Sequence, residues 1–143
     1  MESIFTEAPP LPKEDRRLIE LYEEAGRTLD DLPYTDDFDQ LIALVRSEGD
    51  RRDKPELWHR LTNLRKAGRL PRLGRSSTPA VEMSANEEEI LTDLIAQQVS
   101  TMGQRDRLPY TPEFENLVRE FNRAMRRSLD EHDVWRLIAR IAK

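Results

Sequence analysis

Two stretches of the chain are nearly the same: DLPYTDDFDQL at Asp31–Leu41 and RLPYTPEFENL at Arg107–Leu117. Each contains Leu-Pro-Tyr-Thr, followed by a phenylalanine and a leucine at the same spacing. The match extends outward to an earlier Leu-Ile pair and a later tryptophan, which are Leu18, Ile19 and Trp58 in one stretch and Leu94, Ile95 and Trp135 in the other. Internal similarity of this kind indicates two copies of one supersecondary unit.

The repeated phrase has the chemistry of a helix start. Thr35 and Thr111 can accept hydrogen bonds from the first free amides of a helix, and the acids or proline that follow suit its first turn. The prolines of the phrase favour an extended conformation for the leucine before each of them. We therefore expect an interhelix corner, in which Tyr34 and Tyr110 recur chiefly for packing.

Apolar residues repeat at helical spacing in both copies. The middle helix of each copy has four on one face: Phe38, Leu41, Ile42 and Val45, matched by Phe114, Leu117, Val118 and Phe121. The first helices are expected over about residues 13 to 25 and 85 to 100, with Gly26 and Gly103 just past their ends. Three acceptors followed three residues later by an acid predict further helix starts, at Asp53, Ser84 and Asp130.

These patterns predict an all-α protein made of two related three-helix units, residues 13 to 68 and 84 to 143. A basic linker or wing at 69 to 83 joins the units, and residues 1 to 12 form a flexible N-terminus. A chain of 143 residues can bury a real core. We expect Trp58 and Trp135 to be buried at equivalent places against the middle helices.

Several kinds of chemistry are excluded or lack support. The chain has no cysteine, so disulfides and thiolates are excluded. His59 and His132 do not align between the copies, neither lies in a metal-ligand spacing, and the five glycines form no phosphate loop. Acidic runs such as EDRRLIELYEE are typical of solvated helix faces. We therefore expect a protein that is not an enzyme and holds no metal or cofactor.

The location follows from what is missing. No apolar run approaches the ~20 residues of a membrane span. The acidic beginning of the sequence also lacks the basic and apolar regions of a signal peptide. We expect a cytoplasmic protein without a membrane partner.

Charge is distributed unevenly, although the net charge is only −5. Residues 1 to 49 and 76 to 118 are acidic, whereas residues 50 to 75 and 119 to 143 are basic. Such asymmetry can orient partners. The sequence LWHRLTNLRKAGRLPRLGRSS, at Leu57–Ser77, joins the third helix of the first unit to a turn-rich stretch bearing several arginines.

This region resembles the winged helix-turn-helix family, with three helices, a basic third helix and then a segment containing glycine and arginine. The resemblance implies that the third helix enters the DNA major groove and that the wing touches phosphates or the minor groove. Carried over by position, the residues facing bases and phosphates would be Arg60, Asn63 and Lys66. Those following the DNA backbone would be Arg69, Arg72 and Arg75.

Two other interpretations of the charge pattern remain open. The basic stretch can be a solvated helix face followed by a linker. The acidic helices of one molecule can also meet the basic helix of another, as in a protein adaptor or a self-assembling homo-oligomer. We expect a non-catalytic binding protein, with DNA as the first partner and another protein as the alternative.

Overall fold

The computed structural model describes residues 10–76 and 78–142, and all regular structure in this part of the chain is helical. The elements are α1 (Lys13–Ala25), η1 (Leu29–Asp31), α2 (Asp36–Ser47), α3 (Lys54–Lys66), α4 (Ala85–Gln98), η2 (Met102–Arg107), α5 (Pro112–Met125) and α6 (Glu131–Ile141), where η marks a 3₁₀ segment. The predicted all-α fold is confirmed. Most of the N-terminus that was expected to be flexible lies outside the described residues.

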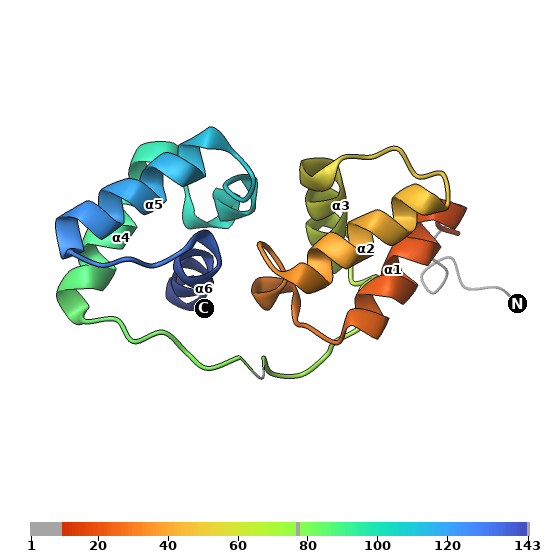
Figure 1. Ribbon diagram of the computed structural model, residues 1–143, viewed down its shortest axis with the longest axis horizontal. Coiled ribbons are helices and arrows are strands. Elements are labelled where there is room, and N and C mark those ends of the chain that lie inside the picture. Colours follow the sequence, from red (N-terminus) through yellow and green to blue (C-terminus); the bar gives the residue numbers. More distant parts are fainter. Residues whose placement is uncertain (1–9, 77, 143) are drawn as a thin grey trace, which may run out of the picture.

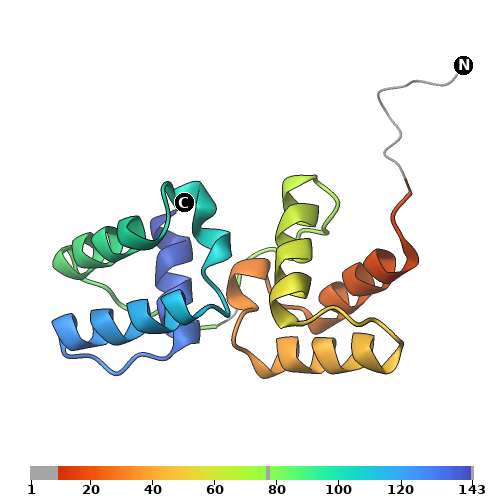
Figure 2. The same cartoon turned by 90° about the horizontal axis from the view of Figure 1, so that it is seen from above.

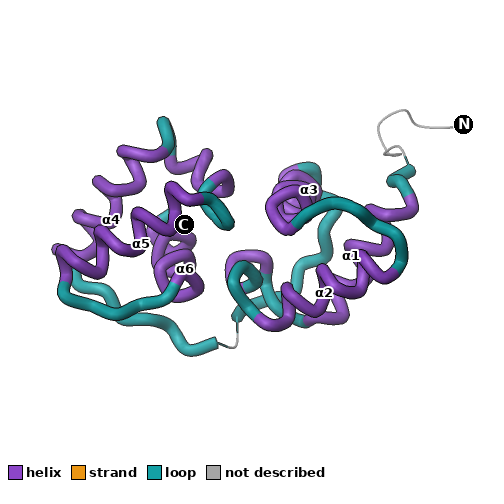
Figure 3. The backbone as a smooth tube through the Cα atoms, turned by 45° about the horizontal axis from the view of Figure 1, so that its top comes forward, coloured by secondary structure: helices purple, strands orange, loops and turns teal. Residues whose placement is uncertain are grey.

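The helices form two groups that face each other (Figure 1). The first group contains α1, α2 and α3, the second contains α4, α5 and α6, and each has a 3₁₀ segment between its first two helices. The groups also lie side by side when seen from above (Figure 2). Residues 69–83, called the strap here, cross from α3 to α4 without helix or strand in their described part (Figure 3).

The predicted helix caps are confirmed. The hydroxyl oxygens of Thr35 and Thr111 accept hydrogen bonds from backbone N–H groups in the first turns of α2 and α5, each 3.2 Å long. Capping boxes form at Asp53 and Ser84, and Asp130 caps α6. The starts of these five helices could be predicted from the sequence because the side chains that cap them lie next to the free backbone amides that they satisfy.

Two predictions about helix ends are wrong. Leu32 and Leu108 precede prolines, but both have right-handed helical backbones instead of extended ones. The reason is that each closes a 3₁₀ segment, with its N–H donating to the carbonyl three residues earlier. In addition, α4 ends at Gln98 and not near Ser100, so Gly103 lies within η2 and does not end a helix.

The tyrosine of each repeated phrase has a left-handed backbone. Tyr34 has φ 65° and Tyr110 has φ 67°, which costs free energy for a residue other than glycine. The backbone N–H of each donates to the hydroxyl of the other, at 2.7 Å and 2.5 Å, and the ring centroids are 4.4 Å apart. The repeated phrase therefore starts a helix and also joins the two groups.

One hydrophobic core runs through both groups. Trp58 and Trp135 are fully buried, as predicted, and their rings meet almost perpendicularly with centroids 5.7 Å apart. Each also lies against a phenylalanine of its own group, Phe38 at 6.5 Å and Phe114 at 6.4 Å. Edge-to-face packing of this kind is favourable for aromatic rings. The two groups are therefore held together by shared aromatic packing.

Each third helix packs against the 3₁₀ segment of the other group, α6 against η1 and α3 against η2. In the part of the chain that the structure describes, no helix has both the length and the apolar character needed to cross a bilayer. The core and the two helix–3₁₀ contacts fix the positions from which the basic side chains project.

Candidate nucleic-acid interface

The exposed face of α3 carries two of the predicted base-contacting residues, Asn63 and Lys66. Arg60 instead turns toward α1, where its guanidinium lies 2.8 Å from the carboxylate of Asp15. Asp15 is buried and also pairs with Arg52 at 2.7 Å. Burial alone would raise the pKa of Asp15, but hydrogen bonds from both arginines lower it overall. Arg60 is therefore held in an internal ion-pair network.

The cations at the C-terminal end of α3 also face acids where the two groups meet. Arg65 donates a 3.0 Å hydrogen bond to Asp30, and both Arg65 and Lys66 lie 3.7 Å from the carboxylate of Asp106. Asp106 is buried in η2. Part of the positive charge that the sequence places on α3 is thus opposed by acids within the molecule.

The strap is fixed to α6 through its backbone carbonyls. Arg136 donates to the carbonyls of Thr78 and Pro79, at 3.0 Å and 2.5 Å, and Arg140 donates to that of Val81 at 3.1 Å. Carbonyls of an extended segment have no helix or sheet partner of their own, so these arginines satisfy them. The strap is therefore held in place by the third helix of the second group.

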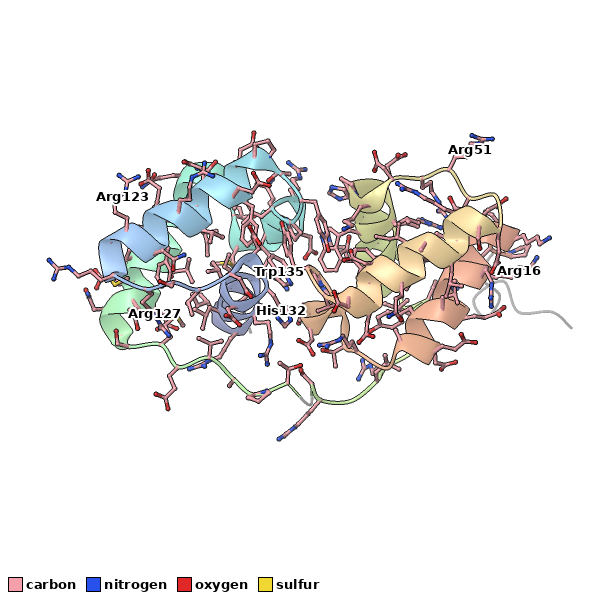
Figure 4. The ribbon with its side chains drawn as sticks, in the orientation of Figure 1. Arg16, Arg51, Arg123, Arg127, His132 and Trp135 are labelled. Carbon is pink, nitrogen blue, oxygen red and sulfur yellow. The ribbon has the colours of Figure 1, made fainter. Side chains whose placement is uncertain are left out.

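Asp31, in η1, connects the strap to both groups. Its side chain is almost fully buried and accepts hydrogen bonds from the hydroxyls of Ser76 and Thr78, at 2.8 Å and 2.7 Å. It also pairs with Arg27 at 3.0 Å and with His132 at 2.9 Å, and His132 lies where α6 faces the first group (Figure 4). Burial would raise the pKa of Asp31, but these hydrogen bonds and the Arg27 charge lower it overall.

A cleft of about 900 Å³ lies between the strap, η1, α6 and the end of α3, and we call it the arginine cleft. Five arginines line it, Arg65, Arg72, Arg75, Arg136 and Arg140. Its two acids, Asp30 and Asp31, are both engaged in ion pairs. Apolar side chains complete the wall, including Leu29, Leu70, Leu73, Val81 and Leu137. The cleft thus combines an excess of positive charge with an apolar surface.

The arginines of the cleft differ in how they are used. Arg72 and Arg75 are exposed, and no acid within residues 10–76 and 78–142 pairs with either. Arg140 is also exposed and uses one guanidinium nitrogen on the strap, although a guanidinium carries five donors. Arg69 is half-buried at the beginning of the strap and does not line the cleft. Arg72, Arg75 and Arg140 can therefore meet an anion.

Sequence reasoning found part of this site. It singled out Arg72 and Arg75, which the structure brings to one cleft, but it missed Arg136 and Arg140, which approach the same cleft from α6. The only signal for these two was the basic character of residues 119 to 143. Nothing in their spacing indicates that α6 lies against the strap.

One group of possible metal ligands occurs in the described residues, made up of Asp130, His132 and Asp133. Their ligand atoms lie within 4.8 Å of one another. However, Asp130 caps the helix and His132 bonds Asp31, so two of the three side chains are already engaged. The group also lies at a helix N-terminus, whose positive end disfavours cations. It is better explained as capping and interface chemistry than as a metal site.

The chain matches no protein-family model, no curated protein and no solved structure.

Proposed function

We propose that this protein is a non-catalytic nucleic-acid-binding protein, with DNA as its first candidate partner, and that the arginine cleft is its contact surface. The observation that carries the proposal is the convergence of arginines from α3, the strap and α6 on one cleft. Arginine donors suit phosphate oxygens both in charge and in geometry. Arg72, Arg75 and Arg140 supply the exposed donors.

Binding gains its free energy mainly from neutralised phosphates and released counterions. The exposed acids of α1 and α2 repel the polyanion elsewhere on the molecule, which directs it to the cleft. Asn63 and Lys66 lie on the exposed face of α3, the helix that the winged helix-turn-helix resemblance assigns to DNA. The side-chain amide of Asn63 can form hydrogen bonds with a base edge, and Lys66 adds a contact to a phosphate.

Fluorescence anisotropy with labelled DNA, both duplex and single-stranded, across a salt series tests the proposal. Replacing Arg72 and Arg75 together by alanine should weaken binding and lower the salt slope by about 0.9 per lost phosphate contact on duplex, or about 0.7 on a single strand. The matched control replaces Arg16 and Arg51, which are exposed at the far end of the first group, away from the strap (Figure 4). This control has the same net charge and should keep the wild-type slope.

Two results would overturn the proposal. One is binding weaker than about 0.1 mM to both forms of DNA at low salt, which is the weak end of non-specific binding. The other is an equal loss of affinity in the cleft variant and in the control, because that would indicate attraction to net charge alone. Sedimentation of the protein without DNA, over the same salt series, then tests the alternative of a self-assembling adaptor.

A further inference from the structure

The arginine cleft has two chemically different parts. Arg72, Arg75 and Arg140 are exposed at its opening, whereas its wall includes the half-buried leucine and valine side chains of the strap, Leu70, Leu73 and Val81. Its volume of about 900 Å³ falls within the range of sites that enclose a small organic group, roughly 300 to 1,000 Å³. Phosphate neutralisation alone requires no apolar hollow. The wall therefore suits an apolar group attached to an anion.

A DNA duplex makes poor use of such a cleft. The bases of a duplex are stacked inside it, so a protein reads them by placing a helix or a β-ribbon in a groove. The arginines of α3 that would serve this purpose are engaged, Arg60 with Asp15 and Arg65 with Asp30. The strap, which forms one side of the cleft, has no helix or strand in its described part. Within the cleft, a duplex would therefore touch only the charged opening.

A single strand has the complementary chemistry. Its unpaired bases can turn outward and lie against aromatic or apolar side chains or guanidinium planes, while the phosphates on either side face cations. In the cleft, Leu73 is half-buried on the strap between Arg72 and Arg75, whereas Arg140 is the exposed side chain that α6 contributes. The strap therefore offers an apolar side chain beside its arginines, and α6 offers a guanidinium plane. A base between the strap and α6 would have its neighbouring phosphates near the arginines.

From this arrangement we propose that the arginine cleft binds single-stranded nucleic acid, with an unpaired base held between the strap and α6. The proposal rests on the proposed function and specifies the form of its ligand. Contact with the face of a base is tolerant of base identity, because every base has a π-face. Binding should therefore show strand preference with little sequence preference.

Three fluorescent probes of about 12 nucleotides separate the contributions of bases and phosphates. They are a thymidine single strand, a strand of the same length made only of abasic nucleotides, and a duplex. The thymidine strand should bind at least about tenfold more tightly than the abasic strand, which corresponds to about 1.4 kcal/mol. A uridine strand of equal length shows whether RNA is bound as well as DNA.

A substitution in the wall tests where the base lies. Leu73→Ala should remove most of the preference for the thymidine strand over the abasic strand while leaving the abasic affinity unchanged, since no charge is lost. The matched control is Leu44→Ala, because Leu44 is 46% exposed on α2 and does not line the cleft. Circular dichroism should show the same helix content in both variants.

The outcomes separate this inference from the proposed function. Equal binding of the thymidine and abasic strands, or tighter binding of the duplex, overturns the single-strand proposal and leaves nucleic-acid binding intact. No binding of any probe overturns the proposed function itself. A Leu73→Ala variant that keeps the full preference for the thymidine strand shows that the base is not held against the strap, which also overturns the proposal.

Discussion

The two junctions between the helix groups have the same arrangement, a third helix packed against a 3₁₀ segment, but they differ in their polar interactions. In the Asp31 junction, α6 packs against η1, and in the Asp106 junction, α3 packs against η2. Both place a buried aspartate of a 3₁₀ segment opposite cations of a third helix. Asp31 has close partners from α6, the strap and its own group, whereas the cations nearest Asp106 are 3.7 Å away.

For the tryptophans, the better hydrogen bonding is found in the Asp106 junction. Trp58 Nε1 donates to the backbone carbonyl of Asp106 at 2.9 Å, while Trp135 Nε1 has no acceptor within residues 10–76 and 78–142. The backbone hydrogen bond thus belongs to the Asp106 junction and the ionic network to the Asp31 junction. Asp31 itself accepts hydrogen bonds from Ser76 and Thr78 of the strap. The aromatic rings therefore hold the two groups together, and the Asp31 junction positions the cleft.

Large effects are expected first from the aromatic packing that the two groups share. Trp58→Ala and Trp135→Ala should each lower the free energy of unfolding by about 3 to 5 kcal/mol, because both leave a cavity in one continuous core. Urea denaturation should show a single transition for each variant. Two separate transitions in either variant would contradict a common core.

The next effect separates the junctions. Asp31→Ala should cost about 3 to 5 kcal/mol, because it leaves His132, Arg136 and two strap hydroxyls without their buried acceptor. Asp106→Ala should cost less, since its cations lie beyond hydrogen-bond distance and one of its carboxylate oxygens has no hydrogen-bond partner in the described part of the chain. Equal losses of unfolding free energy would show that the two junctions are equivalent.

The pH dependence of the unfolding free energy should test the same ion-pair network around Asp31. The pKa of Asp31 is lower in the folded protein than its ordinary value, so the carboxylate stabilises the fold fully above a pH of about 4. This stability is lost as the pH falls through the folded-state pKa. Asp31→Asn should therefore flatten the decrease of unfolding free energy below about pH 4. An unchanged acid slope would contradict the ionised state of Asp31.

Parts of this architecture follow from the sequence because the interactions involved are local. Thr35 and Thr111 satisfy amides three residues away, and the spacing of apolar residues identifies the buried faces. The left-handed backbone of Tyr34 was not predictable, because it depends on a hydrogen bond to the hydroxyl of Tyr110, 76 residues away. Local patterns do not contain that contact.

The cleft was only partly predictable for the same reason. Arg72 and Arg75 stand out as basic residues in a turn-rich stretch, but Arg136 and Arg140 reach the strap through tertiary packing. Asp15 belongs to an acidic run that was expected to be a solvated helix face. Its burial against Arg60 depends on how α1 and α3 pack, which a sequence pattern does not specify.

The smallest expected effect compares the two indoles. Trp58→Phe should cost about 1 kcal/mol more than Trp135→Phe, because only Trp58 loses a hydrogen bond to a buried carbonyl. Both substitutions remove a similar volume, so the difference between them isolates the hydrogen bond. Equal unfolding free energies for the two variants would show that Trp135 Nε1 has an equivalent acceptor.

The most direct measurement of ligand binding is NMR of the arginine side chains during titration with a thymidine single strand. The Nε–Hε signals of Arg72, Arg75 and Arg140 should shift together, in proportion to the bound fraction, while those of Arg16 and Arg51 stay in place. Such a result would locate the nucleic acid at the cleft beside the Asp31 junction. Shifts spread evenly over all exposed arginines, or no shifts at saturating strand, would contradict a binding site formed by the strap and α6.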